Sequence, residues 1–195
     1  MISYKIEKTR EKILQVADRL FGHYGFYKTS MDEIAKIARK AKGSLYYHFA
    51  SKEELFKEVV AKEIQNLKRE LNEVVNSDIN AKNKIKAYLM KRMQIIETAS
   101  NYRETLKADF YEHFDFIDGL RNDLDNWEKN KIGQIINEGI EAGEFMKMPN
   151  TEVIIDVFIM VFKGLEIPFF IQGKYKKLNP YFDDMLGILI RGISK

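Results

Sequence analysis

The sequence predicts an all-α protein with about nine helices. Apolar residues recur three and four positions apart along most of the 195-residue chain, which is the spacing of one helix face. Breaks in this spacing coincide with residues that cap or end helices, among them Ser30, Ser51, Gly25 and Gly143. Apolar residues make up 45% of the chain, which suffices for one small domain and one of medium size.

The first predicted helix spans about residues 5–24, and Gly25 is expected to cap it. Ser30 and Glu33 then form a predicted capping box, so a second helix starts at Ser30. Residues 39–41 would make a turn before a short segment over residues 42–49. A second capping box, Ser51 with Glu54, starts the next helix. A short segment rich in Lys, Ser, Tyr and His between capped helices is typical of the recognition helix of a helix-turn-helix.

From about residue 10 to residue 55 the chain resembles the tetracycline-repressor (TetR) family of one-component transcription regulators, which are all-helical homodimers. The resemblance rests on ILQVADRLFGHYGF, TSMDEIA and KGSLYYHFASKEEL, in that order. One departure concerns the turn, where the family usually has Gly-Val-Ser and this chain has Arg39-Lys40-Ala41. Either the turn has another shape, or Arg39 takes the positive φ that glycine would supply.

The resemblance implies a helix-turn-helix DNA-binding domain over residues 7–67 and a helical ligand-binding and dimerisation domain over residues 68–195. The partner would be double-stranded DNA with a palindromic operator. Side chains that suit base or phosphate contacts near helix N-termini are Thr29, Ser30, Lys42, Gly43, Ser44, Tyr47, His48 and Lys52. Tyr46 and Phe49 are expected in the core instead.

The remaining helices are predicted over residues 52–75, 81–98, 104–114, 117–142, 153–171 and 180–194. Asn179 and Pro180 would start the last one. The helix over residues 153–171 is the most apolar, but its Asp156, Lys163 and Glu166 argue against a membrane span. It is better explained as buried between the domain core and another subunit. Lys163 and Glu166 are expected to pair with each other or to reach the rim of the dimer interface, the alternative being that one of them lines a ligand cavity.

In the TetR family the last two long helices form a four-helix dimer interface. The residues expected there are Gly164, Phe182, Met185 and Leu189. The second domain is also expected to enclose a mainly apolar cavity for a small lipophilic effector. The large side chains that would line it are Tyr88, Met93, Phe110, Phe114, Trp127, Phe158 and Phe162. The same side chains would equally suit a solid core.

One cluster could suggest a metal site or acid–base chemistry: Asp109, Glu112, His113 and Asp115. Surface pairing explains it better, because ligands from a single helix do not define a site. The chain has no cysteine, and no phosphate loop, nucleophile elbow or zinc spacing occurs. We therefore expect neither an enzyme nor a cofactor or metal. No apolar export segment follows Met1, so a cytoplasmic protein is expected.

Charge is distributed unevenly along the chain. Through Leu55 there are 11 Lys or Arg and seven Asp or Glu, whereas the other 21 basic and 22 acidic residues nearly cancel. A positive excess at one end is expected if that end faces phosphates. The sequence thus predicts a ligand-responsive repressor released from its operator by a lipophilic effector. The alternative is a helical interaction module whose helix-turn-helix no longer reads DNA.

Overall fold

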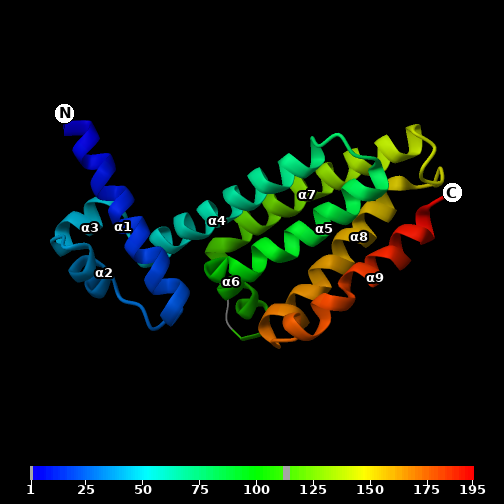
Figure 1. The fold of residues 1–195 in the computed structure, drawn as a ribbon. Helices are drawn as coiled ribbons and strands as arrows, with labels where there is room; N and C mark the ends of the chain where they lie inside the picture. The colour runs from blue at the N-terminus through cyan, green and yellow to red at the C-terminus, as the bar shows by residue number, and fades with distance from the viewer. Residues whose placement is uncertain (1, 112–114) are drawn as a thin grey trace. The chain divides into compact units, whose positions relative to one another are not determined.

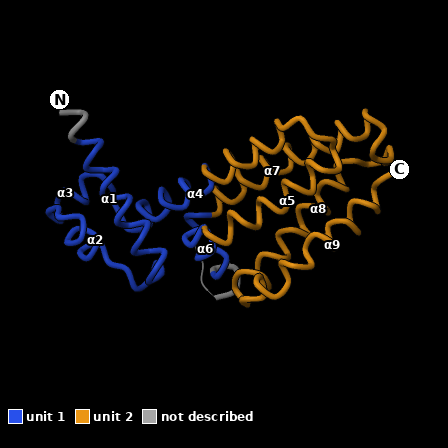
Figure 2. The backbone as a smooth tube through the Cα atoms, in the orientation of Figure 1, with its two compact units in different colours: residues 1–65, 99–117 blue, residues 66–98, 118–195 orange. Residues whose placement is uncertain are grey.

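The computed structural model describes residues 2–111 and 115–195, and side chains except those of residues 2–5 and 108–111. Within these residues the chain forms nine α-helices and one π-helical segment (Figure 1). The prediction of an all-α fold with about nine helices is confirmed. The helices divide between two compact units, residues 1–65 with 99–117 and residues 66–98 with 118–195 (Figure 2). Unit 1 thus includes residues 99–117, which the sequence assigned to the second domain; the domain boundary after residue 67 stays a prediction.

Unit 1 contains α1 (Ile2–Tyr24), α2 (Met31–Ala38), α3 (Lys42–His48), the first part of α4 (Lys52–Val75), and α6 (Ser100–Tyr111). Its core centres on an aromatic cluster in which the Phe56 ring lies 5.1 Å from the ring of Phe21 and 5.0 Å from that of Phe26. Phe49 is wholly buried, as predicted. Gly25 ends α1 with a φ of +84°, so the predicted cap is confirmed.

Helix α6 begins at Ser100, earlier than the sequence indicated, because Glu63 of α4 caps it. The Glu63 carboxylate accepts hydrogen bonds from the backbone amides of Asn101 and Tyr102, at 3.2 and 2.6 Å. These amides have no partner within their own helix, so a carboxylate at this point stabilises the helix start.

Unit 2 contains the rest of α4, α5 (Ala81–Thr98), most of α7 (Asp115–Glu141), α8 (Thr151–Glu166), the π-helical segment η1 (Ile167–Ile171) and α9 (Tyr175–Ile193). The predicted helix over residues 153–171 therefore changes type near its end. Pro168 lies in the first turn of η1, where its missing amide and its ring disfavour a regular α-turn.

The predicted start of the last helix at Asn179 and Pro180 is wrong. Helix α9 begins five residues earlier, at Tyr175, and Pro180 lies inside it. Tyr175 is buried, and its ring lies 5.9 Å from that of Phe169 and 5.4 Å from that of Phe170. This packing fixes an extra turn before the proline.

Candidate nucleic-acid interface and regulatory core

Helices α2 and α3 form the helix-turn-helix of unit 1. The capping box at the start of α2 is present: Ser30 Oγ accepts from the amide of Glu33, whose carboxylate accepts from the amide of Ser30. Arg39 ends α2 with φ +56° and ψ +49°, the left-handed conformation that the family's glycine would take. Of the two alternatives for this turn, Arg39 therefore takes the positive φ that glycine would supply.

The surface of α3 presents most of the predicted DNA contacts to solvent. Lys42 and Gly43 are exposed, and Tyr47 is 73% exposed. Ser44 and His48 are partly buried. Burial, with Arg10 and Lys40 as nearby positive charges, lowers the pKa of His48 and favours its neutral form. His48 would therefore act as a hydrogen-bond donor rather than as a cation.

Three other predicted contacts are engaged within unit 1. Thr29 is 3% exposed, and its hydroxyl donates to the carbonyl of Gly25 at 2.8 Å. The Ser30 hydroxyl serves the capping box. Lys52 Nζ donates to the carbonyls of Phe26 and Thr29 and lies 4.3 Å from the centre of the Phe26 ring. The side chains of Thr29 and Lys52 therefore hold the loop before α2, which leaves the Thr29 hydroxyl unavailable to DNA.

The prediction that Tyr46 lies in the core is wrong, since the side chain is 44% exposed. It lines a shallow pocket of about 400 Å³ with Lys42, Lys52 and Asp32. The sequence placed Tyr46 in the core and did not indicate Asp32 as a candidate contact, yet both line this pocket. An acidic residue is common in the first turn of a helix, so Asp32 did not stand out. Tyr46 was counted among the apolar residues, which are expected to be buried.

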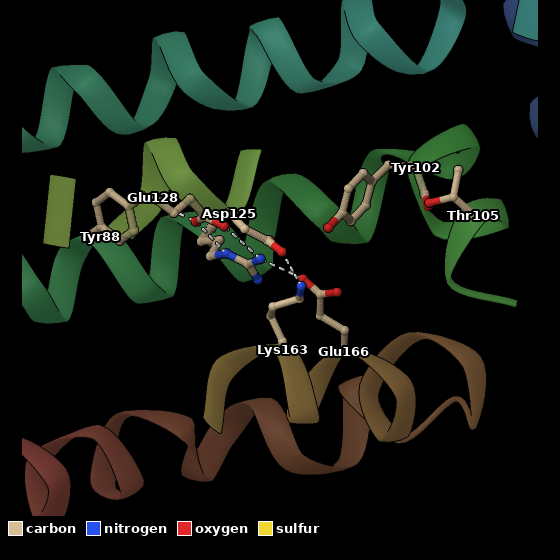
Figure 3. Close-up of polar contacts among 8 residues, drawn as sticks. Tyr88, Tyr102, Thr105, Asp125, Glu128, Lys163 and Glu166 are labelled. Atoms are coloured by element: carbon tan, nitrogen blue, oxygen red, sulfur yellow. Dashed lines mark hydrogen bonds and ion pairs between the residues drawn. The ribbon is translucent and has the colours of Figure 1, made fainter. Parts of the chain in front are cut away.

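A network of buried charges lies in the centre of unit 2, linking α5, α7 and α8 (Figure 3). Arg92 donates to Glu128 through Nε at 2.7 Å and to Glu166 through Nη2 at 2.6 Å. The Tyr88 hydroxyl donates to Glu128 at 3.2 Å. Burial raises the pKa of Glu166 in spite of the attraction of Arg92. Lys163 forms its ion pair with Asp125 rather than with Glu166, although its positive charge also lowers the pKa of Glu166.

The residues predicted to line a cavity differ in how deeply they are buried. Tyr88, Met93, Phe158 and Phe162 are buried. Trp127 is partly exposed, with Lys68 and Lys131 over its ring. Phe114 and the side chain of Phe110 lie outside the described residues. Glu128 and Glu166 are each only 1% exposed, and both carboxylates pair with Arg92.

Helix α8 carries an exposed apolar face: Val153, Val157, Met160, Val161 and Gly164. On α9 the side chains of Tyr181 and Ile188 are more than 60% exposed, and Met185 and Leu189 are half-buried. Phe182, an expected interface residue, is 2% exposed and packs 5.7 Å from Phe169. Phe182 therefore belongs to the core of its own protomer.

The described part of the chain supports neither a metal site nor a membrane-spanning helix. It contains no group of three or more potential metal ligands; Glu112 and His113 lie outside it, as does the side chain of Asp109. None of its helices has the length and apolar character that crossing a membrane requires.

Comparison with known proteins agrees with the helix-turn-helix assignment. Residues 13–59 match the family described as bacterial regulatory proteins, tetR family. The transcriptional regulator QacR of Staphylococcus aureus is 30% identical over 140 residues, which cover 70% of this chain and 73% of QacR. The chain belongs to the tetR family. It is therefore a DNA-binding transcriptional regulator, and the tetR family is one of transcription regulators rather than of enzymes.

Two further relatives of this tetR-family chain extend over nearly its whole length. The transcriptional repressor KstR2 of Mycobacterium tuberculosis is 24% identical over 200 residues, which cover the whole chain and 97% of KstR2. The structure of FadR from Bacillus subtilis in complex with stearoyl-CoA is 17% identical, covers 94% of this chain and 98% of FadR, and superposes with a TM-score of 0.76. The FadR likeness establishes the fold of the whole tetR-family chain.

Proposed function

We propose that this protein is a homodimeric repressor that binds a palindromic operator through α3 and leaves it when unit 2 binds a small lipophilic effector. The exposed surface of α3, carrying Lys42 and Tyr47, is the observation that supports this most directly. Recognition helices of this kind place N-terminal residues against base edges in the major groove, and a two-fold protein sets half-sites about 34–36 Å apart or at a multiple of that distance.

The dimer is proposed from the apolar faces of α8 and α9. Val157 and Met160 on α8 and Tyr181 and Ile188 on α9 are exposed in the protomer. Large contiguous apolar surfaces of this kind mark interfaces, and a two-fold contact between copies would cover both helices at once.

The effector is proposed to bind in unit 2, beside the buried charges. Ligand sites are mostly apolar with a few well-placed polar groups. Phe158 and Phe162 supply buried aromatic surface on α8, two turns and one turn before Glu166 respectively. The structure of FadR with stearoyl-CoA is a precedent for an acyl ligand on this fold.

The alternative, a helix-turn-helix that no longer reads DNA, was motivated by the altered turn. Because Arg39 adopts the left-handed conformation at the end of α2, this motive is removed. The discriminating test is a selection from random duplexes at low salt with the wild-type protein. A palindromic consensus is expected, and Tyr47→Ala should bind it more weakly. Tyr24→Ala, which removes another exposed tyrosine of unit 1, is the control. Failure to enrich any sequence would favour the interaction module.

The effector class is tested by thermal melting with fatty acids, acyl thioesters and cationic dyes. A ligand at a hundred times its dissociation constant stabilises the folded state by about 2.7 kcal/mol. By linkage, a true effector must also weaken operator binding. Stabilisation by the cationic dyes alone would overturn the lipophilic assignment.

A further inference from the structure

Asp32 and Lys42 form an ion pair across the helix-turn-helix. Lys42 Nζ lies 2.8 Å from Oδ1 and 3.0 Å from Oδ2 of Asp32. Lys42 is the first residue of α3, and Asp32 lies in the first turn of α2. Both side chains remain more than half exposed, at 60% for Lys42 and 63% for Asp32. The pair is thus held together on the surface that is proposed to face DNA.

A carboxylate is an unexpected group on such a surface. Most of the affinity of a protein for any DNA comes from lysines and arginines that neutralise phosphates, whatever the sequence. Asp32 repels phosphates and offsets the charge of the lysine nearest to it. The pair therefore lowers sequence-independent affinity for DNA. Its position on this surface needs another explanation, such as a role in recognising the DNA sequence.

The hydrogen-bonding groups of the pair match one base pair. An ammonium has three donors, so Lys42 keeps donors for O6 and N7 of guanine while one hydrogen contacts Asp32. Each carboxylate oxygen has a second lone pair, so Asp32 can still accept a hydrogen bond from N4 of cytosine. In the major groove a G·C pair presents both partners side by side, whereas phosphate offers acceptors alone.

We propose that Asp32 is a specificity-determining residue, which directs Lys42 away from phosphates and forms with it a donor–acceptor pair that selects a G·C base pair in each half-site. This rests on the proposed binding of α3 in the major groove. Lys52, another lysine of the same pocket, shows a different arrangement, since it is held by two backbone carbonyls of its own unit. Lys42 is held by a side chain that can itself contact a base.

The test compares Asp32→Asn with Glu53→Gln, a matched control. Glu53 is an exposed carboxylate in the first turn of α4, so both variants remove one negative charge from unit 1. Selection from random duplexes and titration of non-specific DNA at several salt concentrations are run on both. Asp32→Asn should lose roughly tenfold in preference for G·C at one position of each half-site. Its log–log salt slope on non-specific DNA should become steeper by about 0.9, as Lys42 takes up a phosphate.

The control should keep the base preferences of the wild-type protein. Lys42→Met should lose the same G·C preference, and adding it to Asp32→Asn should remove the extra salt dependence. Melting curves establish that each variant is folded. Unchanged base preferences in a folded Asp32→Asn protein, with wild-type operator binding intact, would overturn the assignment of Asp32 alone. A wild-type protein that enriches no sequence would overturn the proposed function, and this inference with it.

Discussion

Nη2 of Arg92 lies 2.6 Å from Oε1 of Glu166, and both side chains are only 2% exposed. Glu128 accepts hydrogen bonds from Nε and from the same Nη2 of Arg92, at 2.7 and 3.0 Å. One buried cation therefore holds two buried carboxylates from different helices. Removing the cation would leave like charges together in a medium that solvates them poorly, which is far more costly than losing a surface ion pair.

We predict that Arg92→Ala lowers the free energy of unfolding by about 3–5 kcal/mol. Chemical denaturation followed by circular dichroism measures the change. Lys91→Ala is the control, because Lys91 pairs with Glu70 at a partly exposed site, and surface pairs contribute only about 0–1 kcal/mol. An equal, small loss for both variants would show that the buried pairs contribute little net stability.

Glu166 should also make stability depend on pH. Burial raises its pKa above the ordinary value, so between the two values the folded state binds more protons than the unfolded state. Stability contributed by this group is then greatest below the ordinary pKa and falls as pH rises through the raised one. Glu166→Gln mimics the protonated form, so the wild-type protein should lose stability relative to it as pH increases. Parallel denaturation curves from acidic to neutral pH test this; a constant difference would contradict it.

Asn101 provides a second test of buried polar groups, in unit 1. It is 0% exposed, and its Nδ2 donates to Asp18 Oδ1 at 2.7 Å and Glu63 Oε1 at 3.0 Å. Asn101→Asp keeps the shape but places a third carboxyl between two others. We predict a loss of about 3–5 kcal/mol near neutral pH, which shrinks at acidic pH as the new group becomes protonated. Asn101→Ser is the control without charge, and an equal loss in both variants would exclude the electrostatic cause.

Arg39 is the described non-glycine residue with a positive φ. Left-handed backbone costs an L-residue about 1–2 kcal/mol, a cost that glycine avoids. Arg39→Gly should therefore raise the melting temperature, whereas Arg39→Ala removes the same long side chain and should not. If both variants have the same melting temperature, the change in stability comes from loss of the Arg39 side chain and not from its backbone conformation.

The fold followed from the sequence because helix starts and stops depend on nearby residues. The Ser30–Glu33 capping box and the Gly25 cap were predicted from a few neighbours each, and both are present. Where prediction failed, distant residues decided the outcome. The start of α6 depends on Glu63, 38 residues before Asn101 in the chain, and no local pattern indicates that contact.

The candidate site was predictable in position but not in detail. Lys42 was identified as a candidate contact, but its partner Asp32 lies ten residues away on another helix. In unit 2 the error was larger. Lys163 and Glu166 are neighbours at helical spacing, yet each bonds to a different helix. The residues next to Arg92 in the sequence suggest a solvent-exposed side chain. Its burial follows only from the packing of the helices.

A substitution at Gly164 tests the proposed dimer interface without disturbing the packing of the protomer. A Cβ atom added there would have no atom within 4 Å in the protomer, unlike one at Gly139, which would lie 2.2 Å from the Phe145 ring. Gly164→Leu should therefore leave the fold intact and weaken the dimer by about 1–3 kcal/mol through overpacking. Gly139→Ala should instead destabilise unit 2. Sedimentation velocity at micromolar concentration and thermal melting separate the two effects. A wild-type protein that sediments as a monomer would contradict the dimer, and a Gly164→Leu dimer of unchanged affinity would place the interface away from this part of α8.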